Sequence, residues 1–155
     1  MGEKTPCSDK EVMGEKTPPS DKKVDVQGMV RLVEQSGIYQ LLGMEVLEAR
    51  PGYSRLRVKF REELTHPGRV AHGGVMAALA DSCIACALFG LVETPEQLAF
   101  STIEMKLNYF RPFKEGEMVA EGRIIQKGST IAVGEMDIHD GKGVSYGKGI
   151  ATYKL

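Results

Sequence analysis

The stretch from Gly73 to Leu91 constrains the fold more than any other part of the chain. It reads GGVMAALADSCIACALFGL, and apolar or very small residues occupy nearly every position. A helix that is apolar on all sides has to be enclosed by the rest of the protein. Its alanines and glycines keep it thin enough for a sheet to curl around it. We therefore expect one long central helix that is wrapped on almost every side by a strongly curved sheet.

Strand-like segments on both sides of this helix supply the sheet. Residues 44–60 predict a hairpin that turns at Pro51-Gly52, and four strand patterns follow the helix, at 98–112, 117–128, 130–141 and 143–155. Short turns at 127–129 and 140–142 make the last three strands consecutive antiparallel neighbours. We predict an α+β fold with five or six antiparallel strands.

Two details accompany this prediction. In the last strand, the apolar residues Val144, Tyr146, Ile150 and Tyr153 follow a period of two, with glycines where a sharply curved sheet requires them. Ahead of the first hairpin, apolar residues at helical spacing predict a short amphipathic helix on the outside of the domain, capped by Asp25 and stopped by Gly37.

Length and composition favour one domain, over residues 25–155. The chain has 155 residues, of which 42% are hydrophobic, enough to bury a core. The N-terminus is different, because MGEKTPCSDKEV is followed at once by the near copy MGEKTPPSDKKV. Two short polar copies cannot bury a core, so we expect residues 1–24 to form a duplicated, disordered tail.

Charge and cysteine content exclude several classes of protein. The chain has 20 Lys and Arg against 21 Asp and Glu, so neither nucleic acid nor a membrane surface is an expected partner. Three cysteines do not make a disulfide framework, and with no secretion signal we expect a cytoplasmic protein. Cys83 and Cys86 lie within the apolar helix and not at a turn, so we expect core thiols and no metal site.

Asp81, the lone acid of the apolar helix, is the candidate catalytic group. A poorly hydrated carboxylate is a stronger base and nucleophile, so Asp81 would activate water or attack a substrate directly. The alternative is a buried acid that bridges an interface without chemistry. At the start of the helix, Gly73 and Gly74 offer backbone N–H groups without helical partners, and the Gly73 N–H would stabilise an oxyanion. His72 would orient this turn, donate a second hydrogen bond, or only cap the helix.

Distance separates these two candidates within one chain. Gly73 and Asp81 are eight positions apart, about 12 Å along a helix that rises about 1.5 Å per residue. Both therefore act on one carbonyl only if two helices lie antiparallel across a twofold axis. The spacing predicts a homo-oligomer with its sites at a dimer interface.

Three segments carry a resemblance to a known family: HGGVMAALAD, STIEMKLNYFRPFKEGE and IIQKGSTIAV. From residue 39 to 155 the chain resembles the hotdog-fold acyl-CoA thioesterases of the PaaI-like, phenylacetate-pathway type. The resemblance implies a hotdog fold, hydrolysis of an acyl-CoA without metal or organic cofactor, and a homo-oligomer that is a dimer or a tetramer made of dimers.

The resemblance also implies roles for single residues. His66 stands where the family often has Asn or Gln that places the water or the carbonyl, and Thr102, or its neighbour Ser101, matches a hydroxyl that contacts the water. A further set would bind the substrate, including the CoA phosphates: Gly74, Arg111, Lys114, Lys127, Gly128 and Ser129. Candidates for the lining of an acyl tunnel are Met76, Phe89 and Phe100.

Two other functions are compatible with the same pattern. One is a hotdog hydratase or dehydratase that acts on acyl thioesters, although such enzymes pair a histidine with an acid differently. The other is a non-catalytic acyl-CoA-binding sensor, which would gain nothing from an unpaired acid beside the ester.

Overall fold

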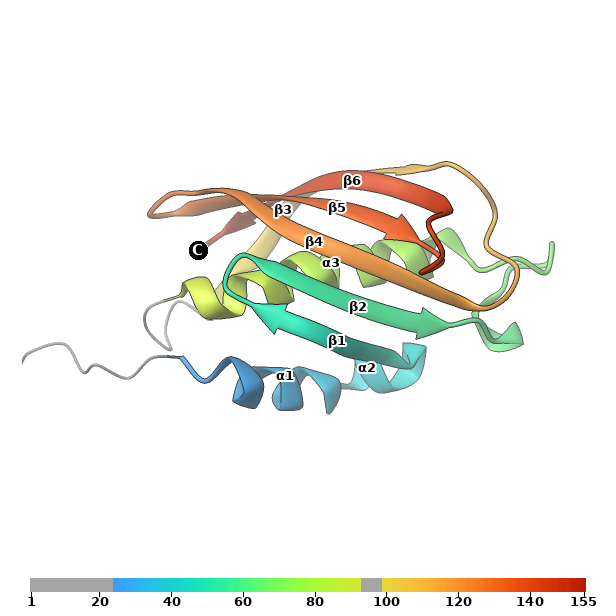
Figure 1. The fold of residues 1–155 in the computed structure, drawn as a ribbon, viewed down its shortest axis with the longest axis horizontal. Helices are drawn as coiled ribbons and strands as arrows, with labels where there is room; N and C mark the ends of the chain where they lie inside the picture. The colour runs from blue at the N-terminus through green and yellow to red at the C-terminus, as the bar shows by residue number, and fades with distance from the viewer. Residues whose placement is uncertain (1–23, 93–98) are drawn as a thin grey trace, which may run out of the picture.

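The computed structural model describes residues 24–92 and 99–155, in which one curved antiparallel sheet packs on one long helix (Figure 1). The sheet has six strands in the order β1-β2-β4-β5-β6-β3. The predicted α+β architecture, a hotdog arrangement, is confirmed. The predicted tail lies, apart from Val24, outside the described residues and stays a prediction. In chain order the elements are α1 (Val26–Glu34), α2 (Gly37–Leu42), β1 (Met44–Arg50), β2 (Tyr53–Lys59), the 3-10 turn η1 (Glu62–Leu64), α3 (Gly73–Leu88), the 3-10 turn η2 (Phe89–Leu91), β3 (Ser101–Tyr109), β4 (Glu117–Lys127), β5 (Ile131–His139) and β6 (Ser145–Lys154).

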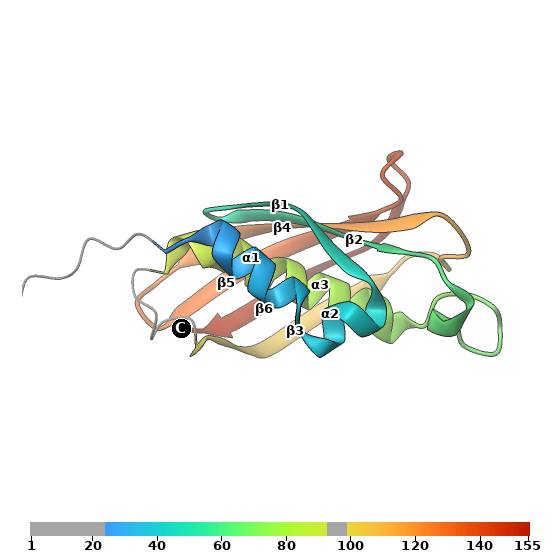
Figure 2. The same ribbon diagram turned by 90° about the horizontal axis from the view of Figure 1, so that it is seen from below.

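The first hairpin is confirmed, whereas the N-terminal helix was only partly predicted. β1 and β2 pair antiparallel around Gly52, whose φ of 78° is the left-handed conformation that favours glycine. Gly37, predicted to stop the helix, begins α2 instead, because Ser36 adopts an extended conformation and resets the chain direction. Asp25 stands at the N-cap of α1, but its side chain makes no capping hydrogen bond. Both helices lie along the outer side of β1 (Figure 2).

The core is built where α3 presses on the concave face of the sheet. Cys83 and Ile84 are completely buried there. A Cβ atom added to Gly122 would lie 3.0 Å from Cys83 Sγ, and one added to Gly134 would lie 2.9 Å from Ile84 Cδ1. Side chains of α3 therefore rest on bare backbone, which is how a helix fits so deeply into this sheet.

β6 turns both small and large residues toward the helix. Ala151 and Tyr153 are buried, whereas Ile150 and Val144, which precedes the strand, are exposed. A Cβ atom on Gly147 would lie 3.2 Å from Met76 Sδ, so this glycine faces α3. Small residues at 147 and 151 therefore let α3 approach the strand closely.

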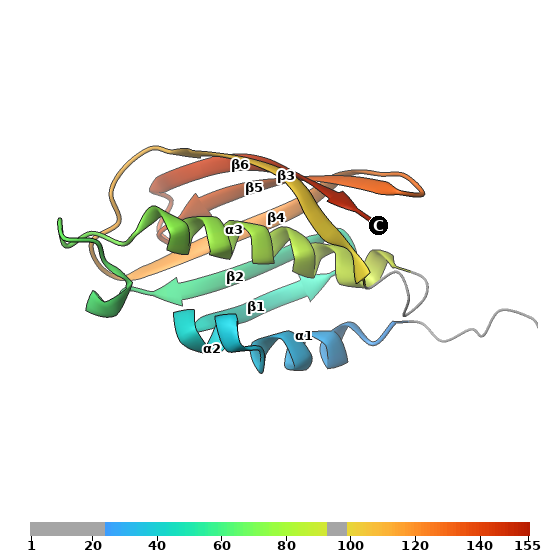
Figure 3. The same ribbon diagram turned by 180° about the vertical axis from the view of Figure 1, so that it is seen from behind.

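The helix is also less enclosed than its composition predicted. A stripe along α3 stays half-exposed, and we name it the α3 stripe; it consists of Ala77, Ala78, Asp81, Ser82 and Ala85. The sheet covers one side of α3 and the N-terminal helices lie beneath β1, so this side faces the viewer in Figure 3. By length and composition alone Gly73–Leu91 could cross a membrane, but more than half of it is buried inside the domain.

Candidate active site

The N-terminal turn of α3 leaves one backbone donor free. His72 is the N-cap, and its Nδ1 accepts a hydrogen bond of 2.9 Å from the Gly74 N–H, while the Val75 N–H donates to the His72 carbonyl at 2.9 Å. Within residues 24–92 and 99–155, no hydrogen bond engages the Gly73 N–H. The donor predicted for an oxyanion is thus unoccupied, whereas the Gly74 N–H is used by the cap.

Local packing explains both glycines. A Cβ atom on Gly74 would lie 2.9 Å from His72 Nδ1, so a side chain there would break the cap. A Cβ atom on Gly73 would meet the Tyr109 ring at 3.4 Å, and the Tyr109 hydroxyl donates to the Gly73 carbonyl at 3.3 Å. Tyr109 therefore forms one wall of this turn.

Asp81 is not an unpaired acid, contrary to the expectation from the sequence. Its Oδ1 accepts a hydrogen bond of 2.7 Å from Thr102 Oγ1 and another of 2.5 Å from the Tyr153 hydroxyl. Thr102, expected from the resemblance to contact the water, thus lies beside the acid, whereas Ser101 makes no hydrogen bond to it. Asp81 itself is half-buried.

Tyr153 is the residue that sequence reasoning missed. It is almost completely buried, and burial, followed by its hydrogen bond to Asp81, raises its pKa well above the ordinary value. A signal did exist, because a tyrosine buried in a strand needs a partner for its hydroxyl. Asp81 is the acid that the sequence places in the core.

One protomer does not bring the remaining predicted residues to Asp81. Gly73 lies about two turns away along the same helix. His66 is exposed in the loop before α3, where its Nδ1 accepts from the Gly68 N–H at 2.9 Å. No hydrogen bond within residues 24–92 and 99–155 joins His66 to His72 or to Asp81.

The predicted phosphate-binding residues form two separate groups, all of them exposed. Arg111 and Lys114 flank Phe113, whose carbonyl accepts from the Ala71 N–H at 2.8 Å, so this group lies beside the start of α3. The 127–129 turn lies at the other end of the sheet, near Tyr153, which is the register partner of Ala132 on the neighbouring strand. Arg111 and Lys114 therefore lie on the side of Gly73, and the 127–129 turn lies on the side of Asp81.

An apolar cavity of about 620 Å³, which we name the α2–α3 cavity, opens beside the start of α3. Its polar lining residues include His72 and Thr65 together with the charged Arg61 and Glu63, and the others are Ile38, Leu41, Leu42, Leu64, Gly74, Val75 and Ala78. The predicted tunnel residues do not line it: Met76 and Phe89 are buried in the core, and Phe100 packs on Phe89 and Tyr153.

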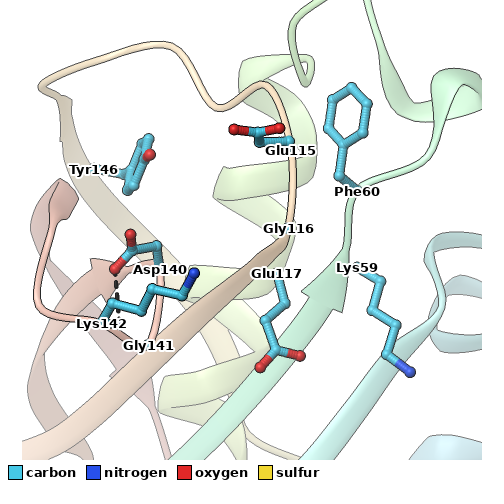
Figure 4. Close-up of a pocket in the computed structure, with 9 residues that line it drawn as sticks. All are labelled: Lys59, Phe60, Glu115, Gly116, Glu117, Asp140, Gly141, Lys142 and Tyr146. Atoms are coloured by element: carbon cyan, nitrogen blue, oxygen red, sulfur yellow. Dashed lines mark hydrogen bonds between the residues drawn. The ribbon is translucent and has the colours of Figure 1, made fainter.

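A larger cavity, of about 880 Å³, lies between the end of β2 and the β5–β6 turn (Figure 4). None of the predicted site residues lines it. Its charges have local roles: Asp140 Oδ1 accepts from the Lys142 N–H at 2.8 Å, and Glu117 pairs with Arg57 at 3.1 Å. We therefore assign this cavity to the end of the sheet and not to the site.

The two cysteines of α3 are free and buried. Burial raises the pKa of Cys83 to about 12 and that of Cys86 to about 11. Cys83 Sγ donates to the Ala120 carbonyl at 3.3 Å, and Cys86 Sγ lies 3.4 Å from the Tyr39 hydroxyl. Within the part of the chain that the structure describes, no group of three His, Cys, Asp or Glu residues is placed to hold a metal ion.

The chain is similar in sequence and in structure to known thioesterases and esterases. Residues 68–146 match the family model described as "Thioesterase superfamily". A putative esterase of Saccharolobus solfataricus is 31% identical over 130 residues, which cover 84% of this chain and 85% of the relative. A 1,4-dihydroxy-2-naphthoyl-CoA hydrolase of Listeria monocytogenes is 24% identical over 67% of this chain and 83% of its own length. In structure, the PaaI protein of the E. coli phenylacetic acid degradation operon aligns with a TM-score of 0.74 at 15% identity, over 86% of this chain and 95% of that chain.

Proposed function

The chain belongs to the thioesterase superfamily and is a thioester hydrolase, and from this premise we propose that it hydrolyses acyl-CoA at a site shared by two protomers. One observation carries the proposal. An acid fixed within an apolar helix, Asp81, and an unoccupied N–H, that of Gly73, lie on one helix but too far apart for a single thioester. The name of the Listeria relative, an aryl-CoA hydrolase, supports CoA as the carrier.

The open edge of β3 and the half-exposed α3 stripe support a dimer. β3 ends the sheet and pairs with β6 alone among the described strands, which leaves its other edge open for a second chain. Large apolar side chains are exposed on or next to this strand, with Ile103 56%, Tyr109 52% and Phe110 53% accessible. Antiparallel pairing of two β3 edges would continue the sheet and set the two α3 stripes side by side. The start of each α3 would then face Asp81 of the other protomer.

The chemistry follows from this pairing. The thioester carbonyl oxygen binds the Gly73 N–H of one protomer, which stabilises the oxygen as it becomes negative. Asp81 of the other protomer removes a proton from water or attacks the carbonyl carbon itself. The carbon–sulfur bond then breaks, and water supplies the oxygen of the carboxylate and the proton of the CoA thiol. A dimer holds two such sites, and a tetramer made of dimers would hold four.

The substrate would use the surfaces that surround these two groups. We place the acyl group in the α2–α3 cavity, which is mainly apolar and is lined in part by His72 and Gly74. The CoA phosphates would meet Arg111 and Lys114 of one protomer and the 127–129 turn of the other, since these groups accompany Gly73 and Asp81 respectively. His66 would help to place the water or the carbonyl. A cytoplasmic location is part of the same proposal and is supported by the free thiols of α3.

A panel of aliphatic and aromatic acyl-CoA substrates, with a thiol reagent that detects released CoA, tests the activity. We expect thiol release by the wild type and at least a 100-fold lower kcat in Asp81→Asn, since that variant loses both basicity and nucleophilicity. Asp137→Asn is the matched control, because Asp137 pairs with Lys148 at 3.1 Å on the outer face of the sheet. Hydration of enoyl-CoA without thiol release would replace the proposal by a hydratase, and tight binding without turnover would replace it by a sensor.

Mixing two inactive variants tests the shared site. Asp81→Asn and Gly73→Pro each damage both sites of a dimer, but a mixed dimer has one site with both changes and one with neither. Random exchange of subunits should therefore restore about a quarter of the wild-type activity. No recovery, when mass spectrometry confirms mixed dimers, would contradict a site formed by two chains.

A further inference from the structure

Two hydroxyl groups from neighbouring strands hold the same oxygen of Asp81. Thr102 and Tyr153 are register partners in the β3–β6 pair, and these strands run side by side past α3 (Figure 3). Thr102 Oγ1 lies 2.7 Å and the Tyr153 hydroxyl 2.5 Å from Asp81 Oδ1. The Tyr153 hydroxyl also lies 2.8 Å from the backbone carbonyl oxygen of Asp81. Tyr153 thus contacts both the side chain and the backbone of the acid.

The Tyr153 hydroxyl acts only as a hydrogen-bond donor toward Asp81. A carboxylate oxygen and a carbonyl oxygen only accept hydrogen bonds, so the Tyr153 hydroxyl donates to them. Its ring is 2% exposed, and Phe100 packs edge-on against it with 5.9 Å between the ring centroids. β6 is held between β5 and β3, so the backbone that carries Tyr153 is fixed on both sides. Burial keeps the hydroxyl protonated, because it raises the pKa of Tyr153.

The two oxygens of Asp81 consequently differ. Oδ1 has two donors, whereas no hydrogen bond to Oδ2 occurs within residues 24–92 and 99–155. We propose that Tyr153 is a positioning residue that anchors Asp81 through Oδ1 and so presents Oδ2 to the water or thioester. The inference rests on the proposed function for the reaction, but the anchoring of Asp81 can be measured without it.

Thr102 alone would not fix the position of the Asp81 carboxylate as firmly. It is exposed on the edge strand β3, where it lies next to the register shift between Thr102 and Glu104. Tyr153 instead comes from an interior strand and is shielded from water, and a hydrogen bond to a charged group is stronger in such surroundings. Tyr153 is therefore the member of the pair that fixes the position of the acid.

Few charged groups disturb this arrangement. Burial raises the pKa of Tyr153 and that of its neighbour Cys86, so neither group carries a charge here. No Lys, Arg or His lies within ion-pair distance of Asp81 in the described parts of the chain. Hydrogen bonds from Thr102 and Tyr153 therefore hold the carboxylate in place.

Tyr153→Phe tests the inference, because it removes the hydroxyl and keeps the ring. We expect kcat to fall about 10- to 100-fold with little change in KM, since a misplaced catalytic group loses rate more than binding. Tyr146→Phe is the matched control, as Tyr146 is on the same strand and its ring packs on Phe113. A wild-type kcat in Tyr153→Phe, or a loss that appears in KM instead of kcat, would overturn the proposal.

A second comparison separates positioning from a purely structural role. If Tyr153 acts through Asp81, then Tyr153→Phe should slow the Asp81→Asn enzyme no further. An equal loss in both backgrounds would show that Tyr153 supports the fold and not the acid, and would overturn the inference.

A crystal structure of Tyr153→Phe tests the anchoring without any activity measurement. We expect the Asp81 carboxylate to leave its wild-type position in this variant, because Oδ1 loses one of its two donors. An Asp81 carboxylate in the wild-type position would refute the anchoring even in an active enzyme. A displaced carboxylate in a protein without thioesterase activity would keep the anchoring and discard the proposed function.

Discussion

Gly73→Pro removes a single backbone hydrogen at the position proposed to bind the oxyanion. Gly73 is the first residue of α3, and proline is well tolerated there because the N–H of that position has no helical acceptor. The preceding residue, His72, has φ −63° and ψ 135°, the extended conformation that proline requires of its predecessor. Among substitutions at this position, proline is the one that removes the N–H donor and keeps the helix intact.

The expected loss follows from the role of that donor. Removal of one oxyanion donor typically lowers kcat by about 10² to 10³. Because Gly73 N–H engages no acceptor among the described residues, the folded protein loses no hydrogen bond, and we expect a melting temperature equal to or slightly above that of the wild type. Steady-state kinetics with the best substrate of the acyl-CoA panel, together with thermal melting, measure both quantities.

Gly73→Ala is the matched control for this experiment. It keeps the N–H, and its Cβ would meet the Tyr109 ring at 3.4 Å, an ordinary contact. We expect this variant to keep most of the kcat. A Gly73→Pro enzyme that is folded and fully active would refute the assignment of Gly73 as the oxyanion donor, and equal losses in both variants would show that bulk and not the N–H is responsible.

Three further outcomes are expected. His72→Ala should lower the free energy of unfolding by about 1 kcal/mol in a denaturant titration, because α3 loses its cap, and His72→Asn, which restores an acceptor, should recover most of it. Cys83 and Cys86 should resist the thiol reagent at pH 8 until the protein unfolds, because pKa values of about 12 and 11 leave almost no thiolate; rapid modification of either in the native protein would contradict the packing around α3. Ile103→Asp should convert the oligomer into monomers in size-exclusion chromatography and abolish hydrolysis, whereas Ile125→Asp, equally exposed on β4, should leave both unchanged.

The part of the fold that was predictable is the part with a strong pattern. The long apolar run located α3, and the Pro51-Gly52 turn located the first hairpin, because both signals come from contiguous residues. Gly37 was misread because a glycine ends one helix and permits another equally well. The outward direction of Ile150 was not predictable, because its apolar character says nothing about which face of the sheet the helix covers.

The site was predictable where a residue type is unusual for its surroundings. Asp81 stands out in an apolar helix, and Gly73 stands out at the first turn. The use of the Gly74 N–H by His72 depends on a rotamer that no local pattern reveals. Tyr153 is 72 positions from Asp81 in sequence, and only the pairing of β3 with β6 places it there.

The glycines of the sheet beneath α3 limit which substitutions this sequence can accept. A Cβ atom on Gly122 would lie 3.0 Å from Cys83 Sγ, and one on Gly134 would lie 2.9 Å from Ile84 Cδ1, so the helix side chain has to move for either. A larger residue in the sheet is accommodated best if the helix residue above it becomes smaller at the same time. Substitutions of these two glycines should therefore arise together with changes at Cys83 or Ile84 among descendants of this chain, and a library that varies both layers should yield more folded members than one that varies the glycines alone.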